Sequence, residues 1–144
     1  MIEKQVILFV RGEQSFDGLE PDVTELMTEG VMTIDSGGGI SLSYQETELT
    51  GMEGTTTCFT IQEDRVVLSR TGGVSSQMVF QQGKLHSSLY ETPWGTMVVD
   101  VSTIKLAHRL DSHGGILEIQ FNIAVDHQVT GRNQFKIRVR ESAR

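Results

Sequence analysis

The sequence has few of the residues that cross-link a chain or interrupt its regular structure. Its 144 residues include one cysteine, two prolines and one tryptophan. Cys58 cannot form a disulfide within the chain, no Asn-x-Ser/Thr sequon is present, and the first ten residues, MIEKQVILFV, lack the long apolar segment and cleavage site of a signal peptide. These absences predict a protein of the reducing cytoplasm.

Long apolar runs and an excess of positive charge are also missing. Apolar runs such as VILFV at residues 6–10 are far shorter than the ~20 residues of a membrane-spanning helix. Twelve Lys and Arg residues against 19 Asp and Glu residues give a formal net charge of −7, which repels phosphate backbones and anionic lipids. We therefore expect neither nucleic acid nor a membrane as a partner. The one basic cluster, KIRVR at residues 136–140, is typical of the solvent face of a strand.

The motifs that bind cofactors and metals are missing as well. None of the 15 glycines belongs to a GxGxxG or GxxxxGK[ST] motif, and the four histidines show no HxH or HExxH spacing. Cys58 has no flanking cation to activate its thiol. Asp111 and His113 lie in a Gly-rich turn, where such residues are favoured for their backbone conformation. We predict no cofactor, no metal and no catalytic residue at these positions.

What the sequence does contain is a period-two alternation of apolar and polar residues, which is typical of half-buried strands. Its clearest run comprises Leu117, Ile119, Phe121, Ile123 and Val125. Strands are expected at residues 3–11, 24–35, 39–49, 54–62, 64–70, 75–82, 84–91, 95–109, 114–126 and 131–141. Short Gly-rich turns join most of them, and Pro21 favours a helical turn in the one long connection, residues 12–23.

This pattern predicts a single all-β domain over residues 1–144, an antiparallel up-and-down β-barrel of eight to ten strands. A barrel of this size has an interior that is either filled by side chains or wide enough for one small ligand.

Several short blocks of the sequence resemble those of a known family. ELMTEG (25–30), LSYQET (42–47), VVLSRTGG (66–73), MVF (78–80) and LYETPWG (89–95) occur in the order found in the YwiB-like family of small bacterial proteins, a domain of unknown function. The resemblance implies a calycin-type, lipocalin-like β-barrel in a cytosolic bacterial protein. It implies no activity, cofactor or catalytic residue. The family more often has Tyr at the position of Trp94, so the resemblance implies an aromatic ring with a polar tip there.

The alternation also predicts charged side chains inside the barrel. The apolar residues of strand 39–49 put Tyr44 and Glu46 on the inner face, and those of strand 64–70 put Arg70 there, with Thr57 on the strand between them. Because strands of a meander alternate in direction, one end of the barrel is expected to hold the connection at 12–23 and the turns near 51–54, 71–74, 92–95 and 127–131. Glu46 and Arg70 are expected at this end, its mouth.

The stretch LYETPWGT extends the predicted mouth. The leucines of strand 84–91 put Glu91 on the inner face and Tyr90 on the outer face. Pro93 has no N–H, so the chain is expected to leave the sheet there, with Trp94 on the rim.

Our leading hypothesis is a non-enzymatic barrel that binds a small polar or anionic molecule at this mouth. The predicted ligand-binding residues are Tyr44, Glu46, Thr57, Arg70, Met78, Tyr90, Glu91 and Trp94.

Two alternatives stay open at this point. Arg70 could pair with Glu46 or Glu91 and plug a filled barrel, which would then be a structural or protein-interaction module using the rim at Tyr90 and Trp94. The protein could also be an enzyme in which Glu46 or Glu91 acts as a general base near Arg70. The oligomeric state is open, with a homodimer among the alternatives.

Overall fold

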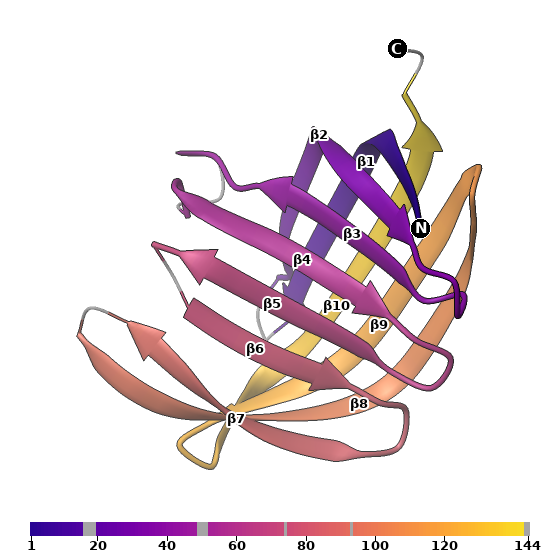
Figure 1. Cartoon of the computed structure of the whole chain (residues 1–144). Coiled ribbons are helices and arrows are strands. Elements are labelled where there is room, and N and C mark those ends of the chain that lie inside the picture. The colour runs from indigo at the N-terminus through magenta and orange to yellow at the C-terminus, as the bar shows by residue number, and fades with distance from the viewer. Residues whose placement is uncertain (16–19, 49–51, 74, 93, 143–144) are drawn as a thin grey trace.

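The computed structural model describes residues 1–15, 20–48, 52–73, 75–92 and 94–142. The described part of the chain forms ten strands (Figure 1): β1 (Ile2–Ser15), β2 (Asp22–Ile34), β3 (Ile40–Gln45), β4 (Thr55–Ile61), β5 (Val66–Gly72), β6 (Ser75–Phe80), β7 (Leu85–Thr92), β8 (Gly95–Asp111), β9 (Gly114–Val125) and β10 (Gln128–Glu141). Within these residues no helix is long and apolar enough to cross a membrane.

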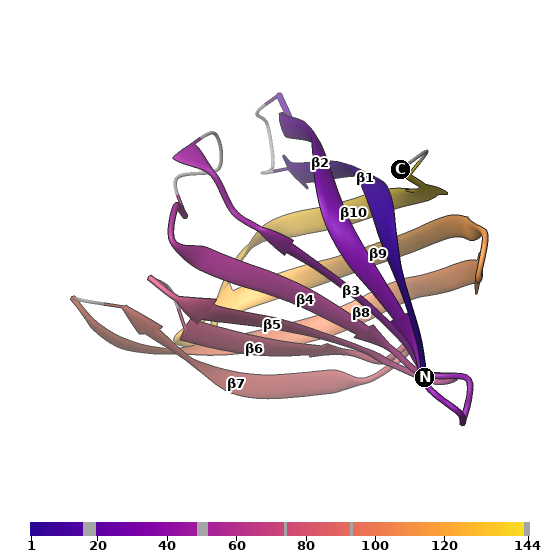
Figure 2. The ribbon, with the colours of Figure 1, turned by 45° about the horizontal axis from the view of Figure 1, so that its top comes forward.

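The strands form one closed barrel with the topology that the sequence predicts. Each strand pairs antiparallel with its neighbours in the chain, and β1 pairs with β10 to close the ring. The closing ladder runs from Val6 opposite Glu141 to Ser15 opposite Arg132, and Figure 2 shows β1 and β10 side by side at this junction. Closure pairs the two end strands, which would otherwise expose backbone edges.

The middle of the barrel is filled by aromatic and aliphatic side chains. Phe121 stacks on Phe135 with ring centroids 5.6 Å apart, and it also contacts Phe80 with centroids 4.7 Å apart. Phe59 meets Phe135 edge-on at 5.9 Å. These contacts come from strands that lie far apart in the sequence, so the interior joins both halves of the chain.

Three strand boundaries differ from the prediction by three residues or more. β1 continues four residues past the predicted end at residue 11, because its polar end pairs with β10 in the closing ladder. β10 begins at Gln128 instead of residue 131, because its first residues pair with the end of β9. β3 ends at Gln45 and not at residue 49. The predicted helical turn at Pro21 is wrong, since Pro21 is irregular and β2 begins at the next residue.

The orientation of β7 is the reverse of the prediction. Leu85 and Leu89 are 61% and 60% exposed, so the apolar residues of this strand face outward. Residues directly opposite each other on paired strands share a face of the sheet. Ser88 lies opposite the buried Val99, so Ser88 and Tyr90, two residues further along, face inward, and Tyr90 packs on the core. Glu91 therefore points to the outside, and the exit from the sheet predicted at Pro93 lies outside the described residues.

Candidate functional site

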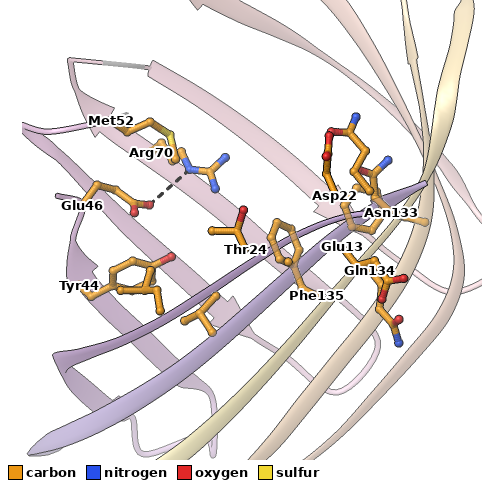
Figure 3. A pocket seen from close by; sticks show the side chains of 15 residues that line it. Glu13, Asp22, Thr24, Tyr44, Glu46, Met52, Arg70, Asn133, Gln134 and Phe135 are labelled. Atoms are coloured by element: carbon orange, nitrogen blue, oxygen red, sulfur yellow. Dashed lines mark ion pairs between the residues drawn. The ribbon is translucent and has the colours of Figure 1, made fainter. Parts of the chain in front are cut away.

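One end of the barrel contains a cavity of about 310 Å³. It lies where β1, β3 and β5 end and where β2 and β10 begin, which is the end predicted for the mouth. Figure 3 shows side chains from opposite sides of the barrel converging on it. The residues that line it are Val10, Gly12, Glu13, Gln14, Asp22, Thr24, Leu26, Tyr44, Glu46, Met52, Arg70, Phe121, Asn133, Gln134 and Phe135.

One wall of the cavity is set by the register of β10, β1 and β2. Asn133 lies opposite Gln14, which lies opposite Asp22, so the three residues form one row across three strands. The next row toward the middle of the barrel contains Phe135 and Thr24. Because alternate residues of a strand share a face, the packing of Phe135 on the core indicates that Asn133 also faces inward.

Across the barrel from this wall, a row of polar residues runs from β3 to β7, and its members Tyr44 and Arg70 line the cavity. Tyr44, Thr57, Arg70, Ser76 and Tyr90 lie opposite one another in succession across the five strands. The prediction that Tyr44, Thr57 and Arg70 face inward is confirmed by their burial. The row thus contains four hydroxyl groups and one guanidinium group.

Glu46 and Arg70 form a buried ion pair at this wall. Their side chains are 1% and 13% exposed, and the Arg70 Nε lies 3.9 Å from the Glu46 Oε2. The Thr57 hydroxyl donates a hydrogen bond of 2.6 Å to the same Glu46 oxygen. Burying a carboxylate is costly unless it is paired and hydrogen-bonded, and Glu46 has both kinds of partner.

Tyr44 lies beside this pair and is a neutral donor. Burial raises the pKa of its hydroxyl well above its usual range, and the negative charge of Glu46 raises it further. The charge of Arg70 acts in the opposite direction but is outweighed. The Tyr44 hydroxyl therefore keeps its proton at neutral pH.

Two buried donors at the cavity lack a hydrogen-bond partner. The Arg70 Nε and the Asn133 Nδ2 are both buried, and neither makes a hydrogen bond within the described part of the chain. Both residues line the cavity. Figure 3 shows Arg70 on one side, near Glu46 and Met52, and Asn133 on the other. Leaving a buried donor unsatisfied costs about 1–3 kcal/mol, so both positions call for an acceptor.

The predicted site residues are only partly brought together. Tyr44, Glu46 and Arg70 line the cavity, and Thr57 contacts Glu46. The remaining four do not line it. Met78 and Tyr90 face inward and pack on the core, whereas Trp94 is 93% exposed and Glu91 faces outward.

The prediction that Glu91 is an inward partner of Arg70 is wrong, because β7 has the reverse orientation and Glu91 faces outward. It lines a separate hollow of about 370 Å³, on which Arg70 also borders. The sequence reasoning also missed the wall built by β1, β2 and β10. Extending the inward alternation of Phe135 by two residues would have identified Asn133. The register that joins it to Gln14 and Asp22 depends on barrel closure.

A Ser–Asp–His cluster on the outside of the barrel has the wrong order for a nucleophile. Asp100 accepts hydrogen bonds from the Ser87 hydroxyl and from His127 Nδ1, the latter at 3.0 Å. An activated serine needs the histidine between itself and the carboxylate. Here the carboxylate lies between the other two, so the cluster orients the surface side chains of the β9–β10 turn.

Comparisons with known proteins agree with this fold and name a family. The family model described as "Domain of unknown function (DUF1934)" matches residues 9–137. The crystal structure of the ywiB protein from Bacillus subtilis is similar, with a TM-score of 0.86 and 22% identity over 98% of this chain and 94% of that chain. The resemblance to the YwiB-like family is thereby confirmed. No curated protein matches the chain.

Proposed function

We propose, from the premise that the chain belongs to the DUF1934 family, that it is a cytoplasmic, non-enzymatic barrel that binds one small polar molecule in the cavity at its mouth. The observation that carries the proposal is the pair of buried donors, Arg70 Nε and Asn133 Nδ2, that line one cavity without a hydrogen-bond partner in the described residues. A ligand that offers acceptors to both would remove a cost of about 1–3 kcal/mol at each.

The size and lining of the cavity support the same proposal. Its volume of about 310 Å³ is at the lower limit of typical ligand pockets, which are about 300–1,000 Å³. Phe121 and Phe135 provide an apolar wall, and a few polar groups stand around it. Pockets for small molecules combine these two elements, apolar surface for affinity and a few polar groups for orientation.

Binding is favoured over catalysis because Glu46, the most buried carboxylate among the described residues, is already held by partners in the protein. Glu46 accepts a hydrogen bond from Thr57 and is paired with Arg70, and its side chain is 1% exposed. A general base must reach a proton on its substrate. The partners of Glu46 hold it within the wall, whereas the Nε of Arg70 and the amide of Asn133 remain as the groups for recognition.

A second candidate function, a protein-interaction module, is supported by exposed apolar side chains on one hairpin. Trp94 is 93% exposed, and Leu89 on the same β7–β8 hairpin is 60% exposed. Tryptophan is enriched among residues that dominate protein interfaces. In this function the hairpin meets another protein or a second copy of the chain, and Trp94→Ser abolishes that association in native mass spectrometry.

Native mass spectrometry of protein purified gently from its own host tests the leading proposal. We expect a retained small-molecule mass at one per chain. Asn133→Leu removes a donor and fills part of the cavity, so it should lose this mass. Thr103→Val is the matched control, because the Thr103 hydroxyl is also buried without a hydrogen-bond partner but does not line the cavity. A bare chain, or a mass retained equally by Asn133→Leu, would contradict the proposal.

A further inference from the structure

We infer that the ligand of this cavity is an uncharged planar molecule, with a carbonyl-type acceptor and an N–H donor, and not an anion. The inference rests on the proposed function and narrows its ligand class. It follows from which charges around the cavity are already neutralised, and from where the remaining donors and acceptors stand.

The positive charge of Arg70 is already balanced by Glu46. The Glu46 Oε2 lies 3.9 Å from the Arg70 Nε, and the carboxylate is almost fully buried. A ligand carboxylate or phosphate that approached the guanidinium would also approach this carboxylate. Like charges brought together in a partly desolvated site repel strongly. Arg70 therefore presents a hydrogen-bond donor without the net positive field that selects an anion.

The other charged groups that line the cavity add to this selection against anions. Glu13 and Asp22 stand on the wall that holds Asn133, and Figure 3 labels both beside it. Arg11 balances Glu13 through an ion pair of 2.9 Å. Among the described residues that line the cavity, Asp22 and Glu46 then oppose the charge of Arg70, so this part of the lining is negative. An uncharged ligand avoids this repulsion.

The hydrogen-bonding groups require both an acceptor and a donor on the ligand. Arg70 Nε and Asn133 Nδ2 each need an acceptor. The carboxylate of Asp22 accepts hydrogen bonds only, so it matches a ligand N–H. Phe121 and Phe135 both line the cavity, so a ring of the ligand has aromatic side chains to pack against. Aryl carboxamides and carbonyl-bearing heteroaromatic rings combine these features.

Three probes of nearly the same shape separate the charge classes: benzamide, benzoate and benzamidine. Isothermal titration calorimetry with the whole chain at one ionic strength measures each. We expect benzamide to bind at least about tenfold more tightly than benzoate, because benzoate meets Glu46. Benzamidine lacks an acceptor for Arg70, so it should also bind more weakly than benzamide. Tighter binding of either charged probe overturns the inference.

Glu46→Gln tests the cause of the selection. It keeps an acceptor for the Thr57 hydroxyl and removes the charge that balances Arg70. We expect benzoate to gain at least about tenfold relative to benzamide, while Thr103→Val leaves the ranking unchanged. An unchanged ranking in folded Glu46→Gln overturns the assigned role of Glu46. The ranking in the unmodified protein decides the ligand class if this variant does not fold.

The molecule retained in native mass spectrometry separates this inference from the proposed function. A retained carboxylate or phosphate compound overturns the inference and leaves the binding function intact. A retained uncharged compound supports both, whether or not the three probes bind. If no molecule is retained, the proposed function itself fails, whereas the ranking of the three probes still decides whether the cavity selects against anions.

Discussion

Replacing Arg70 by methionine leaves the carboxylate of Glu46 buried without its cation. Removing one member of a buried ion pair typically costs about 3–5 kcal/mol. The Nε to Oε2 distance of 3.9 Å is long for an ion pair, and the cavity lies beside it, so we expect a loss at the lower limit, about 3 kcal/mol. A chain of 144 residues has an unfolding entropy of about 0.3 kcal/mol/K, which converts this loss into a fall in Tm of about 10 °C.

A double-mutant cycle with Glu46→Gln separates the ion pair from the packing of Arg70. Glutamine still accepts a hydrogen bond from Thr57, so the double variant buries no unpaired charge. We expect it to be about 2 kcal/mol more stable than the two single losses would predict by addition. Urea and thermal unfolding measure the four proteins. Lys105→Met is the matched control, since it breaks a 3.1 Å ion pair with Glu118 on the outside of the barrel and should cost less than about 1 kcal/mol.

Two results would refute this reasoning about the pair. A loss for Arg70→Met no larger than that for Lys105→Met would mean that Glu46 is solvated or otherwise compensated. Additive losses in the cycle would mean that the two side chains do not interact.

Four further predictions concern pH and glycines with positive φ. Burial raises the pKa of Tyr44, so stability falls as pH rises above the ordinary value of 10.0, and Tyr44→Phe removes this loss in alkaline unfolding curves. The hydrogen bond from Ser87 lowers the pKa of Asp100, so its contribution to stability is lost as pH falls below the ordinary value of 3.8, and Asp100→Asn flattens the acid limb of a Tm series. Gly115→Ala should cost about 3 kcal/mol in urea unfolding, because φ is +143° and a Cβ would collide with the backbone carbonyl oxygen of Arg109. Gly38 has a φ of +88°, but a Cβ there would lie in open space, so Gly38→Ala should cost about 1–2 kcal/mol.

The part of the site on β3, β4 and β5 could be predicted because local patterns determine it. These strands are short and alternate regularly, and the tight turn at residues 62–65 fixes the pairing of β4 with β5. The inward position of Glu46 follows from that of Tyr44, and that of Arg70 follows from the buried valine and leucine before it. Short-range alternation therefore correctly predicted Glu46, Thr57 and Arg70 as one group.

The β7 strand could not be read in the same way, because its apolar residues lie on the outer face. Leu85 and Leu89 were predicted to face inward because they are apolar. Which side of β7 faces inward is decided instead by its pairing with β8. Ser88 lies opposite Val99, which is buried, so Ser88 faces the core although it is polar. Alternation identifies two faces of a strand, and partners identify which one is buried.

The wall that contains Asn133 required information that no local window holds. It depends on the register between β10 at the end of the chain and β1 at its beginning, and on that between β1 and β2. The polar residues of these strand ends carry no apolar signal. Their inward positions follow from the closing ladder, because the register that places Ile137 and Phe135 inside the barrel continues to the strand ends at its mouth.

The composition of the mouth is difficult to explain by stability alone. One row deeper, the residues in the same register are apolar, with Leu42 opposite Phe59 and Phe59 opposite Leu68. At the mouth the row becomes polar, and its Arg70 forms a buried ion pair with Glu46. Replacing such a pair by apolar residues of similar volume is often neutral or stabilising.

The unpartnered donors Arg70 Nε and Asn133 Nδ2 add a cost of about 1–3 kcal/mol each. Local conflicts with good packing are expected where function has selected them. Here the ion pair, the two donors and the cavity coincide at one end of a barrel whose middle is well filled. A ligand that satisfies the donors supplies a common reason for all three.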